Sequence, residues 1–324
     1  MDKQTKVSIV VPSYNRAYII RDALESVLAQ TYGDFEIIVI DDGSSDNTRE
    51  IVEQMQSDKV RYIRHERNRG YSAANNSGIA AAGGQFVAFL DSDDLWKANY
   101  LETLVSFLEK HPETDVVFCD TEVQSDLDGV PSLVALMKSF SQLLKADTGK
   151  SDHVFTARQM YVCLLEEVPI KPSAVVVRRE LFEKAGTFDE AWPSGTDWDL
   201  FLRFAHSAGF GYIDIPLVIQ RRTGDATHQK FRVQDKLFLL GQFLKEKEKL
   251  RNDQEALIAV NRGISGHCSN LGWDYLHAGQ RKKSMAVYLR GFRETGEPAM
   301  LLRAASTLLP LGVRSFLKGA PRQS

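Results

Sequence analysis

The sequence predicts an α/β protein with a mixed, mostly parallel sheet flanked by helices, followed by a helical C-terminal extension. Two observations lead to this prediction. Strand-like and helix-like segments alternate four times within roughly the first ninety residues, which is typical of parallel strands joined by helices. Strand-like segments end near residue 219, and beyond Phe231 helical periodicity runs almost to the end of the chain.

The first four predicted strands are apolar runs rich in β-branched residues, at 7–11, 35–40, 60–63 and 86–90. Continuous apolar runs of this kind are typical of parallel strands that are buried on both faces. Helical spacing of apolar residues predicts helices between them, at 19–30, 48–55 and 72–82. Gly83 and Gly84 close the last of these helices.

The second half of the predicted α/β region is less regular. Helices are expected at 98–110, 156–166, 179–185 and 197–208, and strands at 116–119, 173–177, 212–214 and 217–219, the last two around Pro216. Residues 125–152 are predicted to form a partly helical insertion. Helices at 232–250, 256–276, 281–294 and 298–309 complete the chain. We therefore expect an α/β domain at 1–228, with halves at about 1–122 and 123–228, and a helical region at 229–324.

Composition and charge narrow the class of protein. The 324 residues are 43% hydrophobic and 26% charged, and the net charge of −3 gives no reason to expect a nucleic-acid partner. Three scattered cysteines, Cys119, Cys163 and Cys268, indicate a reducing, cytoplasmic compartment. We expect no signal peptide, because the chain enters its first strand at Val7. No apolar run approaches the roughly 18 residues of a membrane span, so any membrane contact is expected to be peripheral, at the inner face.

A cluster of acids follows the fourth predicted strand directly, with Asp91, Asp93 and Asp94 around Ser92. Ligands of open α/β sheets bind beyond the carboxyl ends of the strands. Clustered carboxylates repel one another unless a cation lies among them, and carboxylates without Cys or His nearby suit Mg²⁺ or Mn²⁺. The alternative interpretation is an acid-rich turn that caps the next helix.

The turn after the first strand, Pro12-Ser13-Tyr14-Asn15-Arg16, contains no glycine. This composition excludes a Gly-x-Gly-x-x-Gly dinucleotide loop and a Walker-type loop at this position. A nucleotide would therefore be bound without a glycine cradle. The second strand also ends in acids, Asp41 and Asp42, followed by Gly43, which permits the turn.

Five motifs taken together resemble the inverting nucleotide-sugar glycosyltransferases of family 2, whose fold is called GT-A. The motifs are VVPSYN (10–15), VIDDGS (39–44), DSDD (91–94), KAGTFDE (184–190) and TDWDL (196–200). Each motif alone is weak, whereas their order and spacing are specific. The resemblance covers about residues 5–225, and the C-terminal hundred residues lie outside it. It implies a donor-binding half, an acceptor half and a divalent metal ion.

The resemblance also implies roles for residues at the strand ends. Asp41 would accept a hydrogen bond from the imide N–H of uracil, an arrangement that suits uridine or thymidine and also guanine, and the ring of Tyr14 would stack on the base. Asp93 would bind the metal directly with Asp91 beside it, and His228 is a weaker third candidate that is otherwise a solvent-facing loop residue. The residues expected to bind the nucleotide are Pro12, Tyr14, Arg16, Asp41, Ser72, Asp91 and Ser92.

Asp197 matches the catalytic base of the family. A carboxylate that takes the proton of an attacking sugar hydroxyl contributes about 10²–10⁴-fold to the rate. In-line attack from the side opposite the leaving diphosphate inverts the anomeric carbon. The alternative role for Asp197 is to complement the helix macrodipole, and Asp199 competes for that structural role.

Two departures from the family pattern affect the site. Thr196 stands where many members carry Glu, and the stretch 72–76 lacks an Arg that many members carry there. A cation for the phosphates or the acceptor must then come from elsewhere. The candidates are Arg69, Lys171, Arg221 and Arg222.

These inferences lead to one functional prediction and two alternatives. We expect transfer of a sugar from a UDP-sugar to a hydroxyl of a glycan or lipid-linked acceptor, with Mn²⁺ or Mg²⁺, in polysaccharide or cell-envelope glycan synthesis. A sugar-nucleotide nucleotidyltransferase would need a Gly-rich loop that this chain lacks. An inactive, sugar-nucleotide-binding scaffold would act through the helical tail. The tail ends in a basic amphipathic stretch that either lies on an anionic membrane or packs on the α/β domain.

Overall fold

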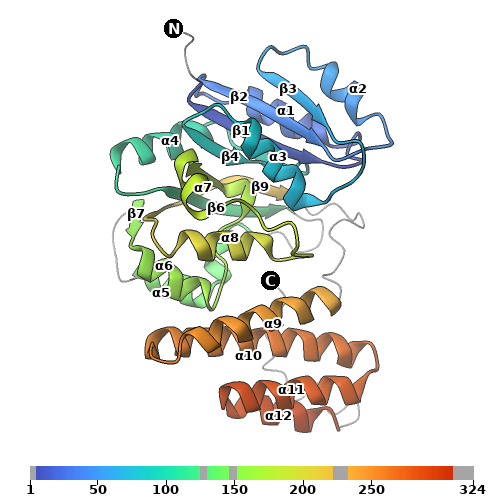
Figure 1. The fold of residues 1–324 in the computed structure, drawn as a ribbon, viewed down its shortest axis with the longest axis vertical. Helices are drawn as coiled ribbons and strands as arrows, with labels where there is room; N and C mark the ends of the chain where they lie inside the picture. Colours follow the sequence, from blue (N-terminus) through green and yellow to red (C-terminus); the bar gives the residue numbers. More distant parts are fainter. Residues whose placement is uncertain (1–4, 125–129, 146–151, 222–232, 309–324) are drawn as a thin grey trace. The chain divides into compact units, whose positions relative to one another are not determined.

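The computed structural model describes residues 5–124, 130–145, 152–221 and 233–308, which belong to two compact units. The first unit comprises residues 1–164 and 168–225, and the second comprises 165–167 and 226–324. Figure 1 shows helices around a sheet in the first unit and a stack of helices in the second. The predicted α/β class with a helical extension is confirmed. The domain bounds and the split into donor and acceptor halves stay predictions.

Four strands form the parallel part of the sheet in the order β3-β2-β1-β4, namely β1 (Val7–Ser13), β2 (Phe35–Asp41), β3 (Val60–Arg64) and β4 (Phe86–Phe89). Alternate residues of β1 pack in one core cluster with α1 (Ile20–Leu28), α2 (Thr48–Glu53) and α4 (Tyr100–Lys110). Val10 points to the opposite face, under α3 (Tyr71–Ala81), where a Cβ on Gly78 would lie 2.2 Å from Val10 Cγ1. The runs are apolar throughout because both faces are covered.

The remaining strands make the sheet mixed. β8 (Val175–Arg178) runs antiparallel to both β4 and β6 (Val116–Gln124), and β6 pairs in parallel with β9 (Phe210–Arg221). β9 also pairs antiparallel with β5 (Asp94–Trp96) and β7 (Asp152–Phe155). The other helices of this unit are α5 (Lys138–Lys145), α6 (Ala157–Leu164), α7 (Arg179–Ala185) and α8 (Thr196–Phe204), with short 3₁₀ turns at Val134–Leu136 and Pro172–Ala174.

The two short strands predicted around Pro216 are a single strand, β9, so this part of the prediction is wrong. Residues 210–213 pair with β7, and residues 218–220 pair with β5. Pro216 lies between these two stretches, where the register with β6 shifts at Asp120. Proline lacks the amide that a ladder requires, and the irregularity removes that requirement locally, so the strand continues.

The second unit contains α9 (Val233–Lys249), α10 (Gln254–His277), α11 (Arg281–Thr295) and α12 (Pro298–Ser306), and each helix packs against the next. Asp253 caps α10, because its carboxylate accepts a hydrogen bond from the Ala256 amide at 3.1 Å. Among the described residues, no helix has both the length and the apolar character that a membrane crossing requires.

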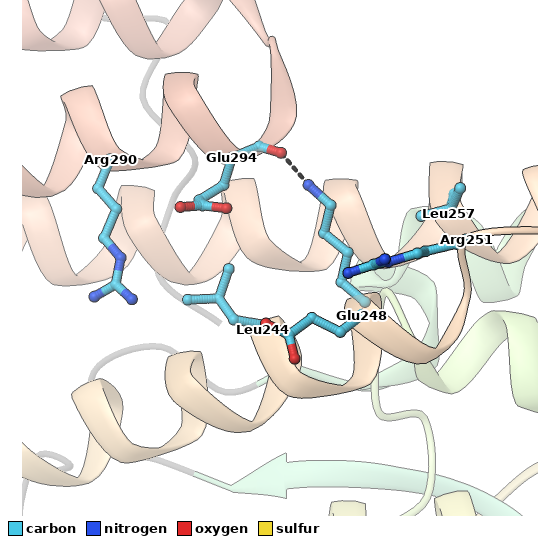
Figure 2. A pocket seen from close by; sticks show the side chains of 7 residues that line it. Leu244, Glu248, Arg251, Leu257, Arg290 and Glu294 are labelled. Carbon is cyan, nitrogen blue, oxygen red and sulfur yellow. Dashed lines mark hydrogen bonds between the residues drawn. The ribbon is translucent and has the colours of Figure 1, made fainter.

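An open cavity of about 490 Å³ also lies in the second unit (Figure 2). Lys247 bridges two helices beside it, because its ammonium donates to the backbone carbonyl of Glu294. The cavity carries charges of both signs and two aliphatic side chains, so its lining does not single out one class of ligand. The residues around it are Leu244, Lys247, Glu248, Arg251, Leu257, Arg290 and Glu294.

Candidate functional site

The carboxyl ends of the parallel strands bring the predicted motifs to one edge of the sheet. Ser13 at the end of β1 is in register with Asp41 at the end of β2, and β4 ends just before the acid cluster. The loop after β1 is bonded to the loop after β2, since the Asn15 amide donates to Ser44 Oγ at 2.8 Å and the Arg16 amide donates to Thr48 Oγ1 at 3.0 Å. Pro12 is buried within β1, and Tyr14 is 45% exposed at the mouth of this edge.

Asp41 is buried, and both of its carboxylate oxygens accept hydrogen bonds. The Ser44 amide donates to Oδ1 at 2.8 Å, and the Tyr62 hydroxyl donates to Oδ2, with Arg64 Nε 3.8 Å away. Burial, together with the bonded Asp41 carboxylate, raises the pKa of Tyr62, so this hydroxyl keeps its proton. Asp41 is only 1% exposed, so a nucleotide base could bond it only if a neighbouring group such as the Tyr62 hydroxyl moved aside.

Asp42 was given no role by the sequence reasoning, and the structure makes it the anchor of the next loop. Its Oδ1 accepts from the Arg69 amide at 2.9 Å and lies 2.7 Å from His65 Nδ1, and its Oδ2 accepts from the Gly70 amide at 2.7 Å. Gly70 has a φ of 93°, which a side chain would strain. Asp42 thereby positions the start of α3, including Tyr71.

Asp91 and Asp93 lie together beyond β4, each beside a different partner. Asp91 Oδ1 accepts a hydrogen bond from the Tyr71 hydroxyl at 3.0 Å, and Asp93 Oδ2 lies 3.6 Å from an Arg16 guanidinium nitrogen. Burial and the charges of Asp93 and Asp197 raise the pKa of Asp91 to about 7, against the opposing effects of Tyr71 and Arg16. Two carboxylates in mutual repulsion are the electrostatic setting that a cation relieves.

Asp94, the last acid of the cluster, is bonded into the fold. It begins β5, is 4% exposed, and accepts a hydrogen bond from Ser173 Oγ at 2.6 Å. Ser173 Oγ in turn accepts from the Asp91 amide at 3.1 Å, so this serine supports the backbone of the cluster from below. Burial and the Asp91 charge raise the pKa of Asp94 well above its usual range. Ser92 is also buried, at 5% exposure.

Asp197 lies in the first turn of α8 and faces the acid cluster. Its charge is one of the causes that raise the pKa of both Asp91 and Tyr71. Gly195, with a φ of 70°, allows the chain to turn into the helix here. Asp199 pairs with Arg203 on the same helix, with oxygen–nitrogen distances of 2.9 and 2.8 Å. Asp197 makes no ion pair with any cation in the described part of the chain.

Tyr71 is a site residue that the sequence reasoning missed. Its ring packs edge-on against Phe188 at 6.2 Å between centroids, and its hydroxyl bonds Asp91. Tyr71 as a whole is 40% exposed, but desolvation at its hydroxyl and the charges of Asp91 and Asp197 raise its pKa well above the usual range, so the hydroxyl stays a neutral donor. The neighbouring Ser72, which was predicted to bind nucleotide, is 7% exposed in α3. No pattern in the sequence distinguishes Tyr71 from a lid or core aromatic.

The candidate cations have different positions. Arg16 reaches Asp93, whereas Arg221 braces the backbone, because its Nε donates to the Asp93 carbonyl at 2.8 Å and its Nη1 to Asp22 at 2.6 Å. Arg69 pairs with Glu190 at 3.3 Å on the surface. Lys171 precedes the short turn that carries Ser173, and Arg222 and His228 lie outside the described residues.

Within the described ranges, no three Asp, Glu, His or Cys side chains converge as a set of metal ligands. The protein therefore offers a pair of carboxylates, Asp91 and Asp93. A pair suffices for Mg²⁺ or Mn²⁺ in sites where substrate phosphates and water complete the coordination. The donor set fits such an ion, because both groups are carboxylates that lie close together at the strand ends, where each charge disfavours ionisation of the other.

The α/β unit carries paired acids at its strand ends, and comparison with known proteins identifies the family. The sequence model of "Glycosyl transferase family 2" matches residues 8–184. The chain belongs to glycosyltransferase family 2.

Relatives in sequence agree with this assignment, and a solved structure shares the fold. An uncharacterized glycosyltransferase of Rickettsia felis is 34% identical over 221 residues, which are 68% of this chain and 33% of the relative. The Escherichia coli UDP-Glc:α-D-GlcNAc-diphosphoundecaprenol β-1,3-glucosyltransferase WfgD is 39% identical over 43% of this chain and 55% of its own length. The chain thus matches only a third to about half of these relatives. The structure of Staphylococcus aureus TarS 1–349 in complex with UDP-GlcNAc shares the fold, with a TM-score of 0.60 at 18% identity over 90% of this chain and 92% of that one.

Proposed function

We propose that this enzyme is an inverting, divalent-metal-dependent glycosyltransferase that moves a sugar from a UDP-sugar to a hydroxyl of a glycan or lipid-linked acceptor, in polysaccharide or cell-envelope glycan synthesis. The supporting observation is the position of Asp197, which lies close enough to Asp91 to raise its pKa although the two are far apart in sequence. The relative WfgD is named for a UDP-Glc donor and a diphosphoundecaprenol-linked acceptor, and TarS was solved with UDP-GlcNAc.

The donor would lie along the edge formed by β1, β2 and β4. Tyr14 offers an exposed ring face for the base, and Asp41 would accept the imide N–H once the Tyr62 hydroxyl has moved. Arg16 lies between this region and Asp93, so its guanidinium would stand beside the diphosphate. A planar guanidinium binds phosphate oxygens in a bidentate manner, which compensates for the arginine that residues 72–76 lack.

Asp93 and Asp91 would hold Mn²⁺ or Mg²⁺ together with oxygens of the diphosphate. When bound, such an ion neutralises the charge that builds up on the departing diphosphate. The protein's own contribution is to keep both carboxylates in place. Ser173 binds the Asp91 amide, Arg221 binds the Asp93 carbonyl, and Tyr71 orients the Asp91 carboxylate through its hydroxyl.

Asp197 would act as the general base. It takes the proton of the acceptor hydroxyl while that oxygen attacks the anomeric carbon from the side opposite the diphosphate, so the configuration inverts. Asp199 holds Arg203, which itself donates to the backbone carbonyls of Ala185 and Thr187. This network fixes the preceding loop relative to α8 and leaves Asp197 available for the acceptor.

We place the reaction in the cytoplasm, at the inner face of the membrane. The chain has only three cysteines, which are scattered in the sequence and buried in the described structure, and this suits a reducing compartment. A lipid-linked acceptor would be presented at a membrane surface. Both points support the location.

A thermal-shift experiment tests the donor and the metal together. UDP-sugars should raise the melting temperature of the purified chain with Mn²⁺ and have little effect when the metal is chelated, because the diphosphate and the ion share one site. Asp93→Asn should abolish the metal-dependent part of the shift. Equal stabilisation with and without metal would refute the metal dependence, and a stronger effect of another nucleoside diphosphate would refute the choice of uridine.

A further inference from the structure

The outward side of α12 is apolar although it is exposed. Its inward residues, Met300 and Ala304, are 2% and 4% exposed, as expected for a helix packed on α11. The positions that the structure leaves exposed from the start of α12 to residue 308 are nevertheless all apolar. They are Pro298, Leu301, Leu302, Ala305 and Leu308. An amphipathic surface helix normally carries polar residues on this side, so the pattern indicates a surface that is covered in use.

The first turn of α11 has a second unusual feature, a run of three cations. Arg281, Lys282 and Lys283 are consecutive, exposed residues in its first turn, which contains no acid. Cations are unfavourable there, because the amino end of a helix already carries partial positive charge. Among the described residues, none of the three has an acid within ion-pairing distance, and Lys283 lies over the ring of Tyr275 at 5.6 Å. Local stability therefore does not explain this basic triplet.

The two features belong to one hairpin. The chain turns between α11 and α12 at Gly296, which has a φ of 72°, and α12 then packs back along α11 toward the end that carries the basic triplet. Figure 1 shows the two helices side by side at one extremity of the helical stack. Exposed leucines thus occur on the same hairpin as three cations that have no ion pair among the described residues.

Net charge favours an anionic occupant over a second copy. Residues 226–324 contain 17 Lys and Arg against 8 Asp and Glu, a net charge of +9, whereas residues 1–225 contain 23 against 35, a net charge of −12. Two copies meeting through this hairpin would bring like charges together. Leucines beside cations instead fit a bilayer with anionic headgroups, into which apolar side chains insert while the cations stay at the headgroup level.

We propose that the hairpin of α11 and α12 docks this enzyme on an anionic lipid surface, with Leu301, Leu302 and Leu308 inserted and the basic triplet 281–283 at the headgroups. The contact is peripheral and reversible, because the inserted area is small. It depends on the helical unit alone and would stand even if the proposed donor chemistry were wrong.

Co-sedimentation of the full chain with vesicles tests the proposal. Vesicles that contain phosphatidylglycerol should bind the enzyme, phosphatidylcholine vesicles should bind it weakly, and added salt should weaken the binding. Leu301→Ser combined with Leu302→Ser should reduce the partition coefficient at least about tenfold. Exchanging the basic triplet for Gln should reduce it by about the same factor and remove most of the salt dependence.

A matched control separates insertion from general loss of exposed apolar surface. Ile215→Ser in the α/β unit removes an aliphatic side chain of the same exposure as Leu301, 41%, and should leave vesicle binding unchanged. All variants change exposed residues, so circular dichroism should show unchanged helix content.

Three outcomes would overturn the proposal. In the first, both variants bind vesicles like the parent. In the second, the leucine variant binds normally while the charge variant loses binding both to vesicles and to a soluble polyanion such as heparin, which would indicate a purely electrostatic site. In the third, light scattering shows that the leucine changes convert a dimer into a monomer without affecting vesicle binding, which would assign the face to a second copy.

Discussion

The two units of this chain carry unfavourable charges of opposite sign. Residues 1–225 have a net charge of −12 and concentrate carboxylates at strand ends, where Asp91 and Asp93 repel each other. Residues 226–324 have a net charge of +9 and place cations at a helix start, where they are unfavourable. The two acids lie close together at the strand ends, where Asp93 is only 8% exposed, whereas the three cations of α11 are exposed and have no ion pair among the described residues. Each group of unfavourable charges therefore indicates a ligand that carries the opposite charge.

The largest expected effect concerns Asp197, the proposed general base in the α/β unit. Asp197→Asn should lower kcat by about 10²–10⁴-fold with little change in donor affinity, because the amide cannot take a proton. Initial-rate kinetics with a UDP-sugar and acceptor, and a donor titration, measure the two quantities. Asp199→Asn is the matched control, because Asp199 lies two residues further along α8 but pairs with Arg203. Comparable kcat values for the parent and Asp197→Asn would remove Asp197 from the mechanism.

The helical unit should respond to acid through His267. Desolvation of this partly buried ring, with Lys236 nearby, lowers its pKa from 6.5 to about 4. The unfolded chain then binds a proton at a pH where the folded chain does not, so stability is complete above pH 6.5 and falls as the pH drops toward 4. The loss of unfolding free energy is at most about 3 kcal/mol. Urea unfolding from pH 7 to about 4 measures it. His267→Gln should flatten the dependence and His277→Gln should not; equal slopes in all three proteins would contradict this account.

The acid pair should make metal binding depend on pH. Since the pKa of Asp91 is about 7 in the metal-free protein, an ion must displace a proton below that pH. We expect the affinity for Mn²⁺ to fall roughly tenfold for each pH unit below 7 and to level off above it. Isothermal titration at several pH values tests this. In Asp91→Asn the remaining binding should be weaker and should lose this dependence, and an unchanged slope would exclude Asp91 as the titrating group.

The smallest effect concerns the cap of α10. Asp253→Ala removes the acceptor for the Ala256 amide and should cost about 1 kcal/mol of stability. Thermal melting of the full chain measures the change. Asp253→Asn retains an acceptor and should recover most of the loss. We expect kcat to be unchanged in both variants. A change in kcat would show that the stability of the helical unit affects the activity of the α/β unit.

Much of this architecture follows from local patterns. Continuous apolar runs mark the strands because both sheet faces are covered, and acids directly after such runs must emerge at the strand ends. The family motifs in order then identify the family. The helices of the second unit follow from periodicity alone, since each packs against its sequence neighbour.

Distinctions among similar residues were decided only by the tertiary structure. Asp94 and Asp199 have the same chemistry as Asp93 and Asp197, yet bonds from Ser173 and Arg203 give them structural positions. Tyr71 became a site residue because Asp42, 29 positions earlier, holds the loop before it. The sequence determined which segments form the sheet and where acids gather, because those depend on neighbours along the chain. Which acid is satisfied by the fold and which still needs a partner depends on contacts between distant segments, and no local pattern records them.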